Sequence, residues 1–141
     1  MQTRKLSSRS WLKTLARFTM GIVFILASSL HFTAREAELK LIPAFLPLRI
    51  EALYITGILE FLGGLGLFVP NAKVRRASAW GLVALLILVF PANVYQAVKN
   101  IQLGGFMNTR LYQWGRLPFQ FVFIWWALWC TSDSVGTDDE R

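Results

Sequence analysis

Four apolar segments divide the chain, and shorter polar or charged stretches separate them. The segments run over Trp11–Phe32, Ile50–Val69, Ala77–Val98 and Leu117–Thr131. A helix needs about 20 largely apolar residues, with a range of roughly 17 to 25, to cross the hydrocarbon core of a bilayer. The segments reach or approach this length, so the pattern predicts an all-α membrane protein built as a bundle of four transmembrane helices.

The first apolar segment also has features of a secretory signal. Basic residues precede it, and the small residues Ala27, Ser28 and Ser29 follow its apolar centre. Because three further apolar segments follow, the first segment is predicted to stay as an uncleaved membrane anchor.

Lysine and arginine near the segment ends predict the orientation, because they mark the cytoplasmic side in short loops. Eight of them lie before or within the start of the first segment and in the turn 70–76: Arg4, Lys5, Arg9, Lys13, Arg17, Lys73, Arg75 and Arg76. The opposite connections hold six: Arg35, Lys40, Arg49, Lys99, Arg110 and Arg116. This modest bias predicts that both termini are cytoplasmic (N-in/C-in).

The termini and the longer connections complete the predicted organisation. Residues 1–10 form a basic cytoplasmic arm, residues 11–131 a single membrane domain and residues 132–141 an acidic, disordered cytoplasmic tail. The connection 33–48 is too short to span a bilayer and too apolar for an ordinary loop, so it is predicted to lie in the outer interface. Pro43 and Pro47 within it should prevent a continuous helix.

Composition agrees with one membrane domain and excludes several other classes. Of the 141 residues, 55% are hydrophobic, and the mean hydropathy is +0.45. The net charge of +7 comes from residues that flank apolar segments, so it favours the lipid bilayer, and not nucleic acid, as the partner. Cys130 is the only cysteine, which excludes an internal disulfide, a CxxC redox pair and a thiolate metal site within one chain. No metal site or self-sufficient catalytic motif is evident, which leaves enzymatic activity undecided.

Glu60 lies near the middle of the second apolar segment, where the only other charge is Glu51 at the edge. An ionisable side chain at that depth costs about 2.5 to 3.5 kcal/mol on insertion scales, so it normally faces other helices or water and finds a partner. Gly57 and Gly64 lie on the same face and should admit another helix at close range. Glu60 is therefore predicted to face the bundle interior, either as part of a site or as a structural hydrogen-bonding group.

The first and third helices also carry polar residues toward the predicted outer side. His31 ends a stripe at helical spacing, either as a structural residue or interfacial anchor or as a proton carrier. Asn93 and Gln96 follow Pro91, which cannot donate a hydrogen bond and so leaves the carbonyl of Ile87 free for another donor.

The fourth helix is predicted to open at Arg116, with Pro118 in its first turn and Gln120 on the same face as Arg116. The N-in topology then brings four polar residues to the outer part of the bilayer and leaves a carboxylate below them: His31, Asn93, Arg116, Gln120 and Glu60. The sequence predicts that these five form a polar pocket, in which Arg116 is the charge partner of Glu60.

A series of short motifs resembles the DoxX family of small four-helix membrane proteins, over about residues 31–129. The motifs are His31-Phe32, Ile42-Pro43-Ala44-Phe45-Leu46-Pro47, Gly57-Ile58-Leu59-Glu60, Gly63-Gly64-Leu65-Gly66-Leu67, Val89-Phe90-Pro91-Ala92-Asn93 and Arg116-Leu117-Pro118-Phe119-Gln120. The resemblance implies a multi-pass protein of the bacterial inner membrane. If the resemblance holds, the relatives of this chain include proteins linked to quinone-coupled sulfur oxidation and to membrane complexes that handle thiol or oxidative stress. More distant eukaryotic relatives assist receptor assembly. The single Cys130 counts against a direct thiol-redox role.

Three functions stay open from the sequence. The first is a membrane component of a redox system, whose pocket holds a quinone head or a small anion while Glu60 exchanges a proton. The chain has no haem-ligand pair, iron–sulfur cysteines or nucleotide fingerprint, so electrons would come from a redox partner subunit. The second is a non-enzymatic assembly or scaffold protein. The third is a small transporter or channel subunit, which would need a homo-oligomer or an open path.

Overall fold

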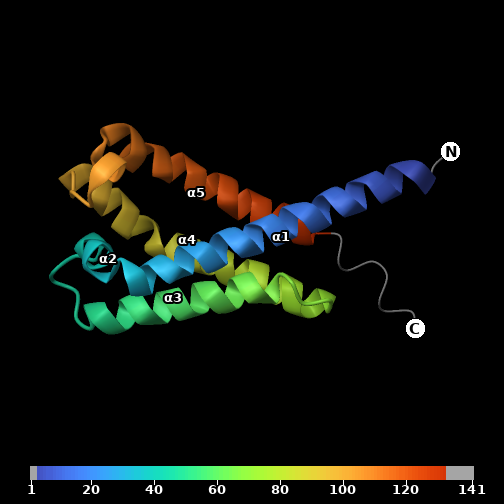
Figure 1. The fold of residues 1–141 in the computed structure, drawn as a ribbon, viewed down its shortest axis with the longest axis horizontal. Helices are drawn as coiled ribbons and strands as arrows, with labels where there is room; N and C mark the ends of the chain where they lie inside the picture. The colour runs from blue at the N-terminus through green and yellow to red at the C-terminus, as the bar shows by residue number, and fades with distance from the viewer. Residues whose placement is uncertain (1–2, 133–141) are drawn as a thin grey trace.

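The computed structural model describes the backbone of residues 3–132 and the side chains of residues 11–132. This part of the chain is all-helical, as predicted (Figure 1). The elements in chain order are α1 (Thr3–Thr33), α2 (Arg35–Leu41), α3 (Arg49–Gly66), α4 (Ala72–Lys99), the 3-10 helix η1 (Gly105–Asn108) and α5 (Arg110–Thr131). Residues 133–141, which hold most of the predicted acidic tail, lie outside the described residues.

The four long helices pack side by side, and each contacts two of the others (Figure 1). They close a ring in the order α1, α3, α4, α5. We call the end that carries α2 the α2 end, and the end that carries the turn 67–71 the turn end. In Figure 1, α1 and α5 lie together toward the turn end and diverge toward the α2 end.

Glycine residues let α1 and α3 pack closely. A Cβ atom added to Gly64 would lie 3.0 Å from the carbonyl oxygen of Gly21. A Cβ atom added to Gly57 would lie 2.8 Å from the Cβ of His31. A larger residue at either position would therefore push the two helices apart. The prediction that the glycines around Glu60 admit another helix is confirmed.

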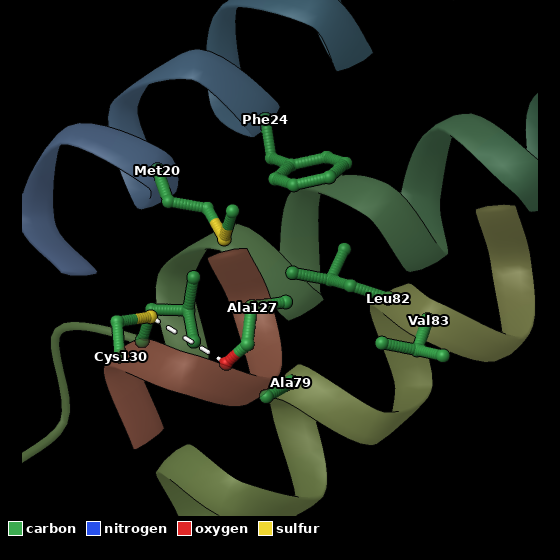
Figure 2. Close-up of a cluster of buried hydrophobic side chains, with 8 residues drawn as sticks. Met20, Phe24, Ala79, Leu82, Val83, Ala127 and Cys130 are labelled. Carbon is green, nitrogen blue, oxygen red and sulfur yellow. Dashed lines mark hydrogen bonds between the residues drawn. The ribbon is translucent and has the colours of Figure 1, made fainter. Parts of the chain in front are cut away.

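An apolar cluster fills the part of the bundle nearer the turn end (Figure 2). It contains residues of α1, α4 and α5 and the residue directly after α3. Their side chains are almost completely buried: Met20, Phe24, Leu67, Ala79, Leu82, Val83, Ala127 and Cys130. The Cys130 thiol donates within its own helix to the carbonyl oxygen of Ala127 at 3.5 Å. This cluster joins α5 to the other three helices.

The outer surface of the bundle carries many large apolar side chains. They occur on all four long helices and include Leu15, Ile22, Leu26, Ile55, Ile58, Leu62, Ile87, Leu88, Phe119, Phe121 and Trp125. Two helical segments, Trp11–Thr33 and Ala72–Lys99, are long and apolar enough to cross a membrane. Charged residues in α3, and tryptophan, tyrosine and glutamine in α5, lower the hydropathy of the other two. The segments Trp11–Thr33 and Ala72–Lys99 are candidate membrane spans by their length and composition.

The start of α5 differs from the prediction. The helix begins at Arg110 and not at Arg116, because the Thr109 hydroxyl caps it by accepting a hydrogen bond from the Tyr112 N–H at 3.3 Å. Pro118 consequently lies inside the helix and not in its first turn. The earlier start makes Tyr112 and Arg116 helical neighbours, which matters for the site.

The structure also shows the conformation of the beginning of the chain and of the first connection. α1 begins at Thr3, so most of the predicted basic arm continues the first helix. The connection 33–48 holds the short helix α2 and then no helix over 42–48, where Pro43 and Pro47 lie. The prediction that these prolines prevent a continuous helix is confirmed.

Candidate functional site

A cavity of about 410 Å³ lies between the long helices in the part of the bundle nearer the α2 end. Its apolar lining consists of Val23, Phe24, Ala27, Leu86, Leu111, Gly115, Phe119 and Phe123, and its polar lining of Glu60, Asn93, Tyr112, Arg116 and Gln120. Leu111 is 86% exposed and Phe119 is 63% exposed, so the cavity opens at the surface beside α5. The size is typical of small-molecule pockets, which measure about 300–1,000 Å³.

Glu60 forms a close pair with His31 of α1. The Nε2 atom of His31 lies 3.0 Å from Oε2 of Glu60, and the side chains are only 17% and 14% exposed. Gly57, one turn before Glu60, makes the pairing possible because a side chain there would collide with His31.

The predicted pairing of Glu60 with Arg116 is wrong. α3 packs directly against α1 but lies across the ring from α5, so His31 reaches the carboxylate first. Glu60 and Arg116 still share the cavity, on different helices. The site therefore has a carboxylate–imidazole pair in one wall and a guanidinium in another.

Two buried amides join α4 to α5. The Nδ2 atom of Asn93 donates to Oε1 of Gln120 at 2.9 Å, and Nε2 of Gln120 donates to the carbonyl oxygen of Leu86. The acceptor is the carbonyl of Leu86, one residue before the Ile87 carbonyl that Pro91 was predicted to leave free.

Arg116 is held by one contact with α4 and one contact within its own helix, α5. Its Nη1 atom donates to Oε1 of Gln96 on α4 at 2.8 Å. Its guanidinium carbon lies 5.6 Å from the centre of the Tyr112 ring, within the range of a cation–π contact. These contacts fix a positive charge in the cavity wall while leaving N–H groups of the guanidinium for a ligand.

Four of the five residues that the sequence predicted as a pocket line this cavity, and the fifth, His31, lies behind Glu60. The prediction did not include Gln96 and Tyr112. Gln96 follows Asn93 at helical spacing, so its face could have been assigned to the same wall. Tyr112 lies before Arg116, where the fourth helix was predicted to open, and the signal that places it in a helix is the capping residue Thr109.

The lining of the cavity would suit an amphipathic molecule. Apolar side chains form most of the wall, and a few fixed polar groups face the interior. Within the part of the chain that the structure describes, no group of three or more His, Cys, Asp and Glu side chains could hold a metal ion.

Fold and site together define a helical-bundle protein with apolar helices suited to a membrane and a small cavity between them. The sequence model of a family described as a domain of unknown function, DUF8561, matches residues 20–131, and the chain belongs to this family. The matched residues include every residue of the cavity lining. No curated protein and no solved structure matches the chain.

Proposed function

We propose that the protein is a multi-pass protein of the bacterial inner membrane that binds the ring of an isoprenoid quinone, as the membrane component of a redox system. The observation that carries this proposal is the cavity. Its polar groups suit a ring with two oxygen atoms, and its opening beside the exposed side chains of Leu111 and Phe119 suits an apolar tail that stays in lipid.

The exposed side chains support a topology in which all four long helices cross the bilayer. Large apolar residues cover α3 and α5 as well as the two helices of highest hydropathy. Soluble monomers rarely expose large contiguous apolar patches. With both termini in the cytoplasm, as the distribution of Lys and Arg favours, the α2 end and the cavity lie on the outer side.

The resemblance of the sequence motifs to the DoxX family supports the redox part of the proposal. Four of those motifs contain the residues His31, Glu60, Asn93, Arg116 and Gln120, which form or adjoin the cavity. A quinone site supplies only one half of an electron transfer, so the proposal includes a partner subunit that delivers or accepts the electrons.

Quinone retention by the purified protein tests the proposal. The full chain is extracted from bacterial membranes in mild detergent, and quinone is quantified per protein by solvent extraction and mass spectrometry. We expect retained quinone in the wild-type protein and about tenfold less in Arg116→Gln, which removes the charged donor from the cavity. Arg110→Gln is the matched control, because Arg110 is exposed on the same helix and lies outside the cavity.

A wild-type protein that retains no quinone, and binds none when a short-chain quinone is added, contradicts the proposal. A non-enzymatic scaffold protein is then the better interpretation. One observation favours that second function: the polar side chains bond across helices to each other, as His31 does to Glu60 and Asn93 to Gln120. Such contacts stabilise a helical bundle even where no ligand binds.

A further inference from the structure

The hydrogen bonds around the cavity determine which of its polar atoms are donors and which are acceptors. We infer that the cavity offers two fixed acceptors to its ligand, and that it therefore binds the reduced, hydroquinone form in preference to the quinone. This inference rests on the proposed function and names the redox state of the ligand.

The first acceptor is Oδ1 of Asn93, and a backbone carbonyl fixes it. The carbonyl oxygen of Leu86 can only accept, so the Gln120 atom that bonds it must be the amide nitrogen. Oε1 of Gln120 then faces Asn93 and must receive its amide nitrogen. Oδ1 of Asn93 is left as the free end of this chain, and Asn93 lines the cavity. Neither amide can rotate by half a turn without losing a hydrogen bond.

The second acceptor is Oε1 of Glu60. The other carboxyl oxygen, Oε2, shares a proton with Nε2 of His31. Whichever of these two atoms carries that proton, Oε1 keeps only lone pairs. Glu60 lines the cavity, and among the described residues its hydrogen bond is the one to His31. The pair thus presents an acceptor to the cavity in both of its tautomeric states.

Arg116 supplies the complementary donor. Its Nη1 atom is used by Gln96, and the remaining N–H groups stay available to an oxygen atom of the ligand. A hydroquinone matches this set, because each hydroxyl donates one hydrogen bond and its oxygen can still accept another. A quinone has only carbonyl oxygens, which cannot donate. On binding it would bury the acceptor oxygens of Asn93 and Glu60 without a hydrogen-bond donor.

The test compares the two redox states of one probe. The full chain in detergent is titrated under anaerobic conditions with a short-chain benzoquinone and, separately, with its hydroquinone, and both dissociation constants are measured by calorimetry. We expect the wild-type protein to bind the hydroquinone on the order of tenfold more tightly. The midpoint potential of the bound couple should rise accordingly, which is a second and independent readout.

The variant Glu60→Gln should bring the ratio of the two dissociation constants toward one. Its amide can turn either its oxygen or its nitrogen to the cavity, because the neutral imidazole of His31 can donate or accept at Nε2. Glu51→Gln is the matched control, since Glu51 is exposed on the same helix and outside the cavity. It should keep the wild-type ratio.

The outcomes separate this inference from the proposed function. Equal binding of both forms by the wild-type protein, or tighter binding of the quinone, overturns the inference and leaves the quinone site in place. Binding of neither form overturns both. A wild-type preference that survives in Glu60→Gln overturns the role of Glu60. The ratio measured for the wild-type protein tests the preference for hydroquinone even if that variant does not fold.

Discussion

Toward the turn end of the bundle, α1 contacts α5 directly. The ring centroids of Phe24 and Phe123 are 6.0 Å apart, and Nζ of Lys13 donates to Oγ of Ser132 at 2.9 Å. Toward the α2 end the same two helices diverge, and the cavity lies between them. There, polar contacts tie α1 to α3 through His31 and Glu60, and α4 to α5 through the two amides and Arg116.

The difference between these two regions follows from the directionality of their contacts. Dispersion contacts between apolar side chains have no preferred direction. The helices can therefore pack closely on all sides of a cluster that contains small residues such as Ala79 and Ala127. Hydrogen bonds join one donor to one acceptor, and here they join the helices in two pairs. The space between the pairs stays open, so the apolar region should carry the stability and the polar region should carry the site.

The largest effect on stability is expected from Leu82→Ala in the apolar region. Leu82 is 1% exposed, and its removal leaves a cavity that costs about 2–5 kcal/mol in proteins. The free energy of unfolding can be measured by denaturant titration in mixed micelles, followed by circular dichroism. Leu88→Ala on the same helix is the control and should cost little, because Leu88 faces outward. Equal losses in both variants would show that the apolar cluster does not hold the bundle.

Smaller effects, of opposite sign, are expected at two glycines, one where α1 meets α3 and one on an open face of α4. Gly57→Ala places a Cβ against His31, and such overpacking costs about 1–3 kcal/mol, offset in part by helix propensity. In Gly81→Ala the new Cβ meets no atom within 4 Å, so this variant should gain about 0.5–1 kcal/mol from the same propensity. The same titrations measure both. A stable Gly57→Ala protein would mean that the close approach of the helices is not needed.

Helical periodicity explains how much of the fold and site could be predicted from the sequence. Glycine on both sides of Glu60 placed that carboxylate on an interior face, and the spacing of His31 placed it on the matching face of α1. Arg116 and Gln120, four residues apart, lie on one face in both the prediction and the structure. These properties depend on residues within one helix, which the local sequence contains.

The rest depends on contacts between helices and could not be predicted in this way. Glu60 pairs with His31 and not with Arg116 because of which helices are neighbours in the ring, and the spacing of residues does not specify that order. The cavity exists because α1 and α5 diverge, which is a property of the whole bundle. The start of α5 is a different case, because the sequence does contain its signal. Thr109 caps the helix, but the prediction relied on Pro118 as a first-turn residue and placed the start at Arg116.

The smallest loss of stability is expected from Asn93→Leu in the polar region. The change removes the hydrogen bond to Gln120, and interhelical hydrogen bonds in membrane proteins contribute about 0.6 kcal/mol on average. The change also leaves the buried Oε1 of Gln120 without its donor, which costs about 1–3 kcal/mol, and the apolar contacts of the leucine offset part of this cost. We expect a net decrease of about 1 kcal/mol in the free energy of unfolding, measured as for Leu82→Ala.

This last variant decides whether the two regions differ in role. If the polar contacts serve a ligand, Asn93→Leu should weaken hydroquinone binding while the protein stays nearly as stable as the wild type, because the apolar cluster is intact. If the polar contacts hold the bundle, the loss of stability should approach that of Leu82→Ala, and the amides would be structural. The two results cannot both occur, since the first requires a folded cavity that has lost only one acceptor.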